Sequence, residues 1–294
     1  MTISGDFLTD KAIKNMIGAG IDGEDARLEV SIFSEAARDT EEFDLFVERR
    51  IKGEPMAYIV GYRDFYRDRF DVIPGVLIPR SDTEILVECA LRFSGALDLP
   101  MGDVINIPES SNDMSNVRFA DLCTGTGCVG ISVYNELRRQ GKNAKGILTD
   151  ISSEALSCAG GNVKRIAADP SDIEVIKDDV LHDDECGEML IPDSFDIIMS
   201  NPPYINESDM KVLDDIVKDH EPHLALAGGE DGLMFYQPIA SKAKRLLRTG
   251  GALMVEHGYD QGEAIRDIFR QNGFNNVTTL RDYGFVDRVT FGVK

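Results

Sequence analysis

Apolar positions recur every three or four residues through the first sixty residues, a spacing that predicts amphipathic helices. The apolar positions of the first two helices are Phe7, Leu8, Ala12, Ile13, Met16, Ile17, Ala26, Val30, Phe33 and Ala37. A third helix is expected to begin with Thr40 as its N-cap. Apolar runs at 70–73 and 76–78 then predict two strands. Residues 1–75 are therefore expected to form a small helical domain that ends in a short β linker.

Strand and helix patterns alternate over the rest of the chain. The predicted strands are 117–122, 146–149, 174–177, 195–200, 252–256, 277–280 and 288–292. The helix patterns between the first six strands are 128–139, 153–165, 209–217, 232–247 and 261–271. Such alternation predicts an α/β fold with a doubly wound, mostly parallel sheet, which binds ligands at the carboxyl ends of its strands. The last two strands have a short link, which suits an antiparallel pair. We expect this second domain over residues 76–294.

Composition and charge narrow the class of protein. The 294 residues are 43% hydrophobic and carry a net charge of −21, which repels phosphate backbones and disfavours direct nucleic-acid binding. Basic residues at 242–245 fit the solvated side of a helix. No apolar stretch approaches the roughly 20 residues of a membrane span, so we expect a cytoplasmic protein without membrane contact. Five cysteines without a Cys-x-x-Cys pair indicate reduced thiols, and we expect no metal site.

A glycine-rich turn follows the first strand of the predicted sheet. Its candidate ligand-binding residues are Asp121, Cys123, Thr124, Gly125, Thr126 and Gly127. Glycines let the backbone approach a ligand closely, and the N–H groups of the following helix point at it. Asp150 ends the second strand, where a carboxylate can accept hydrogen bonds from both ribose hydroxyls. Asp179 and Val180 end the third strand, where they suit an adenine amino group and ring, although acidic pairs are also common in solvated turns.

Two cofactors compete for this pattern. The spacing Gly125-x-Gly127-x-x-Gly130, with Asp150 twenty residues further on, satisfies the dinucleotide fingerprint, so an NAD-dependent oxidoreductase is an alternative. The acid at Asp121 can hold an ammonium group and disfavours a pyrophosphate. S-adenosylmethionine has an ammonium, a ribose and an adenine but no phosphate. The sequence therefore favours S-adenosylmethionine.

The motif Asn201-Pro202-Pro203-Tyr204 directly follows the fourth strand. Proline lacks an N–H and has a fixed φ, so the backbone carbonyls there remain free to accept hydrogen bonds. The Asn201 side chain adds an amide oxygen, and Tyr204 offers a flat ring. The motif thus suits a planar group that bears an NH2, with Asn201, Pro202 and Tyr204 as candidate catalytic residues. A rigid turn without a ligand is the plain alternative.

Two aromatic residues earlier in the chain are candidate walls of the substrate site. They are Phe65 and Phe70, which lie close to the start of the predicted second domain. Both residues also fit a hydrophobic core, which is the more frequent place for phenylalanine.

The chain resembles the release factor glutamine N5-methyltransferases, the HemK/PrmC family, over nearly its whole length. The segment Pro79-Arg80-x-Asp82-Thr83-Glu84 is the more specific part of the match, whereas Asn-Pro-Pro-Tyr also occurs in amino-methylating DNA enzymes. Further matching segments are 49–61, 121–127, 150–156, 201–204, 221–226, 228–233 and 256–261. The chain departs from the family pattern at Cys123 and Ser81, which replace a usual glycine and proline, and at Val180, where an aromatic is frequent.

The resemblance implies a seven-stranded, Rossmann-like class I methyltransferase domain with a small N-terminal helical domain. It implies S-adenosylmethionine as the cofactor, with Cys123–Gly127 and Asp150 around its methionine and ribose parts. It also implies that Asn201–Tyr204 hold a substrate glutamine. That glutamine belongs to the Gly-Gly-Gln loop of a peptide chain release factor, which the helical domain would recognise.

Two other classes share parts of the pattern. An N6-adenine DNA methyltransferase has the same four-residue motif, but it needs a basic segment that reads DNA, and no such segment is visible. A non-catalytic binding module could keep the fold without the chemistry. The presence of Asp121, Asp150 and Asn201 together argues against that class.

Overall fold

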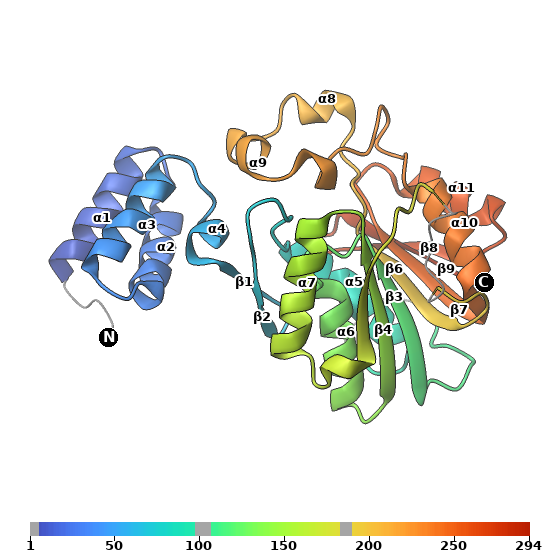
Figure 1. Cartoon of the computed structure of the whole chain (residues 1–294). Coiled ribbons are helices and arrows are strands. Elements are labelled where there is room, and N and C mark those ends of the chain that lie inside the picture. The colour runs from blue at the N-terminus through green and yellow to red at the C-terminus, as the bar shows by residue number, and fades with distance from the viewer. Residues whose placement is uncertain (1–5, 98–106, 183–189) are drawn as a thin grey trace.

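The structure is a computed structural model that describes residues 6–97, 107–182 and 190–294 (Figure 1). Its N-terminal helices pack around a small core of their own that includes Phe33, Phe43 and Phe46. These helices are α1 (Asp6–Gly18), α2 (Gly23–Ala36), α3 (Thr40–Ile51) and α4 (Met56–Val60). Asp39 caps α3 by accepting a hydrogen bond from the Glu42 N–H, so the cap lies one residue before the predicted Thr40.

A hairpin of β1 (Tyr62–Phe65) and β2 (Asp68–Asp71) connects these helices to the large sheet (Figure 1). The strand predicted at 76–78 is wrong, because this segment pairs with no other strand. Its apolar residues are buried for another reason: Val76 packs against α7, and Ile78 packs against α4. The division of the chain at residues 75 and 76 stays a prediction.

The large sheet has seven strands in the order β5-β4-β3-β6-β7-β9-β8. Its strands are β3 (Asn116–Leu122), β4 (Asn143–Asp150), β5 (Ile173–Lys177), β6 (Phe195–Ser200), β7 (Leu247–Glu256), β8 (Asn275–Arg281) and β9 (Asp287–Val293). Neighbours from β5 to β7 are parallel, and β9 runs antiparallel to both β7 and β8. The predicted doubly wound sheet and its antiparallel end are confirmed.

Helices cover both faces of this sheet (Figure 1). The helices α5 (Glu84–Phe93), α6 (Cys128–Arg139) and α7 (Ser153–Ile166) lie on one face, and α10 (Tyr236–Leu246) and α11 (Gly262–Gln271) lie on the other. Side chains alternate between the faces along each strand. Phe119 and Met199 therefore join the core under α5 and α6, whereas Ala120 and Ile198 join the core under α10.

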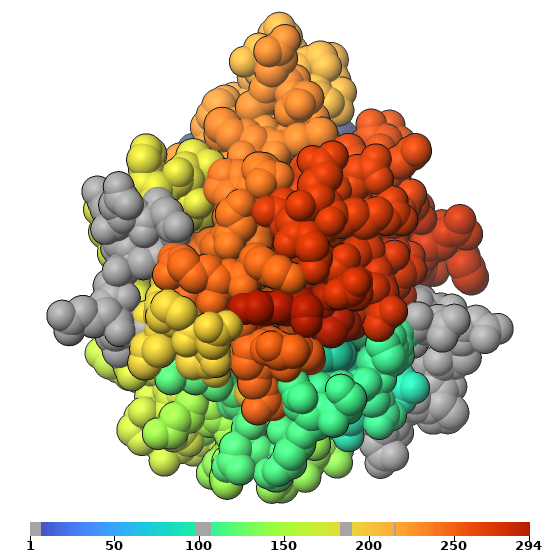
Figure 2. Space-filling view, turned by 90° about the vertical axis from the view of Figure 1, so that its right-hand side faces the viewer, coloured from blue at the N-terminus to red at the C-terminus, as the bar shows by residue number. Residues whose placement is uncertain are grey.

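The helix predicted at 209–217 is wrong in extent: the chain forms two short helices, α8 (Glu207–Met210) and α9 (Asp215–His220). The reason is a second N-cap, because the Asp214 carboxylate accepts a hydrogen bond from the Ile216 N–H and starts a new helix. A single 3-10 turn, η4 (His223–Ala225), follows. Figure 2 shows the α8 and α9 segment as the projecting top of the molecule, above the C-terminal strands and helices.

Three further findings concern membrane-spanning helices, metal-binding groups and cysteines. Within the described ranges, no helix is long and apolar enough to cross a membrane. In the same part of the chain, no group of His, Cys, Asp and Glu side chains is arranged to hold a metal ion. The cysteines at 89, 123, 128 and 158 are free thiols, and Cys186 lies outside the described residues.

Candidate active site

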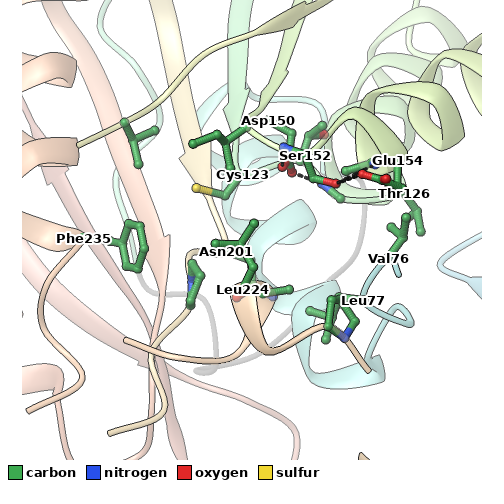
Figure 3. A pocket seen from close by; sticks show the side chains of 18 of the residues that line it. Val76, Leu77, Cys123, Thr126, Asp150, Ser152, Glu154, Asn201, Leu224 and Phe235 are labelled. Carbon is green, nitrogen blue, oxygen red and sulfur yellow. Dashed lines mark hydrogen bonds between the residues drawn. The ribbon is translucent and has the colours of Figure 1, made fainter. Parts of the chain in front are cut away.

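A cavity of about 520 Å³ opens at the carboxyl ends of β3, β4, β5 and β6 (Figure 3). It brings together most of the residues that the sequence selected. These are Asp121, Cys123, Thr124, Gly125, Thr126, Asp150, Asp179, Val180, Asn201 and Pro203. The first four predicted strands therefore deliver the residues at their carboxyl ends to one place, as a doubly wound sheet requires.

The glycine-rich turn needs left-handed backbone at three of its positions, Cys123, Gly125 and Gly127. Gly127 has φ +82°, and a Cβ there would lie 2.8 Å from Ile131 Cδ1, so the start of α6 depends on glycine. Cys123 has φ +57°, a left-handed conformation that side chains disfavour and that glycine adopts without strain. Asp150 Oδ2 accepts the Gly125 N–H at 2.9 Å and so ties the turn to the end of β4.

Buried carboxylates make this end of the cavity electrostatically negative. Burial raises the pKa of Asp121 to about 7, against hydrogen bonds from the Thr124 hydroxyl at 2.6 Å and the Gly130 N–H at 3.0 Å. Burial also raises the pKa of Asp150, against backbone hydrogen bonds from Ser152 and Gly125. Both groups accept hydrogen bonds here without a cation, so a positively charged ligand would stabilise their ionised forms.

The third strand ends in an ion pair that sequence reasoning missed. Lys242 Nζ lies 2.7 Å from both carboxylate oxygens of Asp178, and the two side chains are 2% and 0% exposed. The expectation that Lys242 is solvated is wrong, because it lies on the apolar stripe of α10 near Ile239 and Leu246. That helical spacing was the available signal. The pair anchors the backbone that leads into Asp179, whose carboxylate accepts from the Leu181 N–H.

Replacing Lys242 with methionine is expected to lower the free energy of unfolding by about 3 kcal/mol, because it leaves the Asp178 carboxylate buried without its ammonium partner. Urea denaturation of the chain without cofactor measures this. The matched control is the double variant Lys242→Met, Asp178→Asn, which removes the charge as well and should recover most of the loss. Equal stability of the single and double variants would contradict the argument.

Asn201 faces the cavity with a defined orientation. Its Nδ2 donates a hydrogen bond to Thr83 Oγ1 at 3.2 Å, which leaves its Oδ1 available as an acceptor. The Phe235 ring, which sequence reasoning also missed, lies beside Asn201 in the wall (Figure 3). Pro202 and Tyr204 are outside the cavity lining: the Tyr204 hydroxyl donates to Glu256 Oε1 at 3.4 Å.

Phe65 and Phe70 lie outside the cavity. Their rings pack against each other with centroids 6.0 Å apart, and they are 2% and 0% exposed within the core under α5 and α6. They take the core role that the sequence also allowed, so we do not retain them as substrate contacts. An aromatic residue gives the same sequence signal in a core and in a substrate wall.

One side of the cavity is lined by the segment after α9, which contacts the segment before α5. Pro222 and Leu224 line it, and both belong to the segment after α9. Glu221, 6% exposed, accepts from Arg80 Nη2 at 2.5 Å and from the Ile78 N–H at 3.3 Å. The segment before α5 and the segment after α9 are therefore held together at the mouth of the site.

Glu256 at the end of β7 is the other buried acid near Asn201. Burial raises its pKa to about 7, Thr83 and Arg288 oppose that shift, and Asp82 reinforces it. A folded-state pKa above the unfolded value gives stability that is complete below about pH 4.5 and is lost as the pH rises through about 7.

Replacing Glu256 with glutamine is therefore expected to stabilise the chain at high pH. The difference in free energy of unfolding between variant and wild type should grow from near zero at pH 4.5 to about 3 kcal/mol at pH 8. Urea denaturation at several pH values, without cofactor, checks this. A difference that stays constant with pH would show that Glu256 does not titrate in this range.

Comparisons with known proteins agree with this geometry. A family model described as "Methyltransferase small domain" matches residues 106–230. A release factor glutamine methyltransferase of Neisseria gonorrhoeae is 38% identical over 249 residues, 85% of this chain and 80% of that protein. One from Clostridium acetobutylicum is 35% identical over 250 residues, 85% of this chain and 78% of that protein. A bifunctional methyltransferase of Rickettsia felis is 35% identical over 254 residues, and the match covers 83% of this chain but only 46% of that protein.

Among solved structures, the hMettl16 catalytic domain, determined in complex with a 3′UTR hairpin, shares the fold. The match has a TM-score of 0.54 at 16% identity and covers 76% of this chain and 74% of that one. A glycine-rich turn, an acid after the second strand and Asn-Pro-Pro-Tyr after the fourth thus occur on a methyltransferase fold. The chain belongs to the family of release factor glutamine methyltransferases.

Proposed function

We propose that this protein transfers a methyl group from S-adenosylmethionine to the side-chain nitrogen N5 of a glutamine. The glutamine is that of the Gly-Gly-Gln motif in peptide chain release factors, as the names of the relatives suggest. One observation carries the proposal. The Oδ1 of Asn201, after β6, shares a single cavity with the buried carboxyl group of Asp121 near the end of β3 and the partly buried carboxyl group of Asp150 at the end of β4.

The residues fit S-adenosylmethionine better than a dinucleotide. The cofactor carries a sulfonium and an ammonium, which suit a cavity end where Asp121 and Asp150 are buried without cations. A pyrophosphate would be repelled by the same groups. The proposed cofactor-binding residues are Asp121, Cys123, Thr124, Gly125, Thr126, Gly127, Asp150, Asp179, Val180 and Asn201. Asp150 would accept from the ribose hydroxyls, while Asp179 and Val180 would border the adenine.

The chemical difficulty lies in the substrate. An amide nitrogen is a poor nucleophile because its lone pair is delocalised into the carbonyl group, and S-adenosylmethionine supplies a methyl carbon activated by a sulfonium. Asn201 Oδ1, which faces the cavity, would accept one N–H group of the glutamine, and the second acceptor we propose is the carbonyl of Pro202, a residue just outside the cavity lining. These hydrogen bonds hold the nitrogen in line with the methyl carbon and strengthen as the nitrogen gains positive charge. The nitrogen then loses one proton to solvent, so no strong base is required.

Apolar side chains complete the substrate site. Phe235 and Pro203 line the cavity near Asn201, where they can pack against the amide plane and exclude water. We propose that Tyr204 supports the motif from outside the cavity lining. Its carbonyl accepts a hydrogen bond from Gln261 Nε2 at 2.9 Å, and its hydroxyl donates to Glu256 Oε1. We further propose that the N-terminal helices recognise the release factor and that the enzyme works in the cytoplasm.

The test is direct. The full chain is incubated with labelled S-adenosylmethionine and a purified release factor, and the modified residue is mapped by mass spectrometry. We expect one methyl group on the glutamine of the Gly-Gly-Gln motif and none in a release factor that has alanine there. S-adenosylmethionine, but not NAD, should raise the melting temperature. Stabilisation by NAD alone, or a label on another residue type, would overturn the proposal.

A further inference from the structure

Two buried polar side chains near Asn201 have no role assigned above toward cofactor or substrate: Thr83, which also lines the cavity, and Glu256, which does not. Thr83, 2% exposed, ends the 3-10 turn η1 (Ser81–Thr83) and accepts the Asn201 Nδ2 hydrogen bond at 3.2 Å. Glu256, 1% exposed, ends β7 and accepts from the Tyr204 hydroxyl through Oε1. Three elements far apart in sequence thus converge on one small polar cluster.

The proton of the Thr83 hydroxyl decides how this cluster is arranged. A hydroxyl has a single proton, so a hydroxyl that donates in one direction can only accept in the other. The Glu256 carboxylate is available to take that proton: its Oε2 is buried and has no hydrogen-bond partner within the described residues, and Thr83 acts on Glu256 as a side-chain donor that lowers the pKa of this acid against the effect of burial. Above about pH 7 Glu256 is mostly ionised, and a carboxylate has no proton to give back.

The direction of the Thr83 O–H determines the orientation of the Asn201 side-chain amide. A Thr83 oxygen whose proton faces Glu256 presents only its lone pairs to the amide, so the amide must place its NH2 there and its oxygen toward the cavity. A reversed amide would place its NH2 against the NH2 of a substrate glutamine, where neither group can accept. Only one orientation of Asn201 is therefore competent.

We propose that Thr83 and Glu256 are positioning residues that hold the Asn201 amide with its oxygen turned to the substrate. The inference rests on the proposed function, because it assigns the supports of that same acceptor. It also predicts which replacements are tolerated. Serine in place of Thr83 keeps the hydroxyl, valine removes it at nearly the same volume, and glutamine in place of Glu256 can donate to Thr83 and so reverse the polarity.

The experiment measures kcat, the KM for release factor and the Kd for S-adenosylmethionine in Thr83→Val, Thr83→Ser and Glu256→Gln. We expect kcat to fall about 10- to 100-fold in Thr83→Val and Glu256→Gln, the range of one lost orienting hydrogen bond. The KM and Kd should stay within about threefold of wild type. Thr83→Ser should recover most of the turnover.

A double-mutant cycle separates positioning from general damage. If Thr83 acts through Asn201, then Thr83→Val has little further effect in a chain that already carries Asn201→Ala. Multiplied effects of the two substitutions would overturn the inference, and so would a parallel loss of turnover and S-adenosylmethionine affinity. A wild-type protein that methylates release factor beside an equally active Thr83→Val variant would overturn the inference but leave the proposed function intact.

A readout without substrate makes the inference testable even if the wild type does not methylate a release factor. The side-chain amide signals of Asn201, assigned by their loss in Asn201→Ala, are followed in a 15N-labelled protein by NMR. They are expected to move in Thr83→Val and in Glu256→Gln and to remain near their wild-type positions in Thr83→Ser. Unchanged signals in the first two variants would show that the amide does not depend on this cluster.

Discussion

Replacing Asn201 with alanine is expected to lower the turnover number for glutamine methylation by about 100- to 1,000-fold, the range seen when one preorganised hydrogen-bond partner of a reacting group is removed. The substitution deletes the amide oxygen that would hold the nucleophilic nitrogen. Within the described residues it removes one side-chain hydrogen bond, the bond to Thr83, so the fold should survive. Single-turnover kinetics with saturating cofactor and release factor measure the effect.

A matched control uses another asparagine. Asn275 is exposed on β8 at the edge of the sheet away from the cavity, so Asn275→Ala should keep wild-type turnover. The affinity of Asn201→Ala for S-adenosylmethionine, measured by calorimetry, should remain within about tenfold of wild type, since the main proposed cofactor contacts lie on other strands. Near-normal turnover of Asn201→Ala would remove the central role that we assign to this amide.

Replacing Asp150 with alanine is expected to weaken S-adenosylmethionine binding by about 100-fold or more. Each hydrogen bond to a charged group contributes about 1.5 to 3 kcal/mol, and the carboxylate would receive two from the ribose. The same carboxylate accepts the Gly125 and Ser152 N–H groups at 2.9 and 3.0 Å, so its loss also releases the turn. Isothermal titration calorimetry measures the change directly.

Glu154 provides the control for the expected loss of S-adenosylmethionine affinity in Asp150→Ala. It is an acid in the same wall but is exposed, and an exposed carboxylate contributes little because solvent screens it. Glu154→Gln should therefore change the Kd by less than about threefold. If both variants weakened binding equally, the general negative charge of the wall, and not the ribose contact, would account for the affinity.

The regular part of the fold follows from short-range patterns, because most strands of the sheet contain a short apolar or alternating segment, such as Phe195–Ser200. The exception is β7, which begins at Leu247 although the prediction placed its start at 252. The predicted helix ends at 247 and the predicted strand begins at 252, just beyond the glycines at 250 and 251. These glycines lie where the register between β6 and β7 shifts, and a Cβ on Gly251 would meet the carbonyl oxygens of Phe195 and Asp196 at 3.0 Å. A close backbone approach of this kind involves two distant segments and leaves no local pattern.

The candidate site likewise contains residues that local sequence patterns predict and residues that they do not. Residues that directly follow strands, such as Asp150 and Asn201, were found because position after a strand in an α/β sheet already predicts a ligand edge. Lys242, Thr83 and Glu256 were missed as supports because their importance comes from partners 64, 118 and 52 positions away in sequence. Burial of a polar group is a property of tertiary structure, and sequence spacing alone does not reveal what it contacts.

One pairing within the sheet has an evolutionary consequence. Leu122 and Ser200 are opposite each other in neighbouring parallel strands, and the Ser200 hydroxyl donates to the Leu122 carbonyl at 2.8 Å. The two strand ends are thereby held at one interstrand spacing, about 4.8 Å, immediately before Cys123 and Asn201. Insertions or deletions in the intervening connections can accumulate between species without altering that separation. A one-residue slip between these two strands would instead turn the asparagine to the opposite face, so selection should act on their alignment more strictly than on loop length.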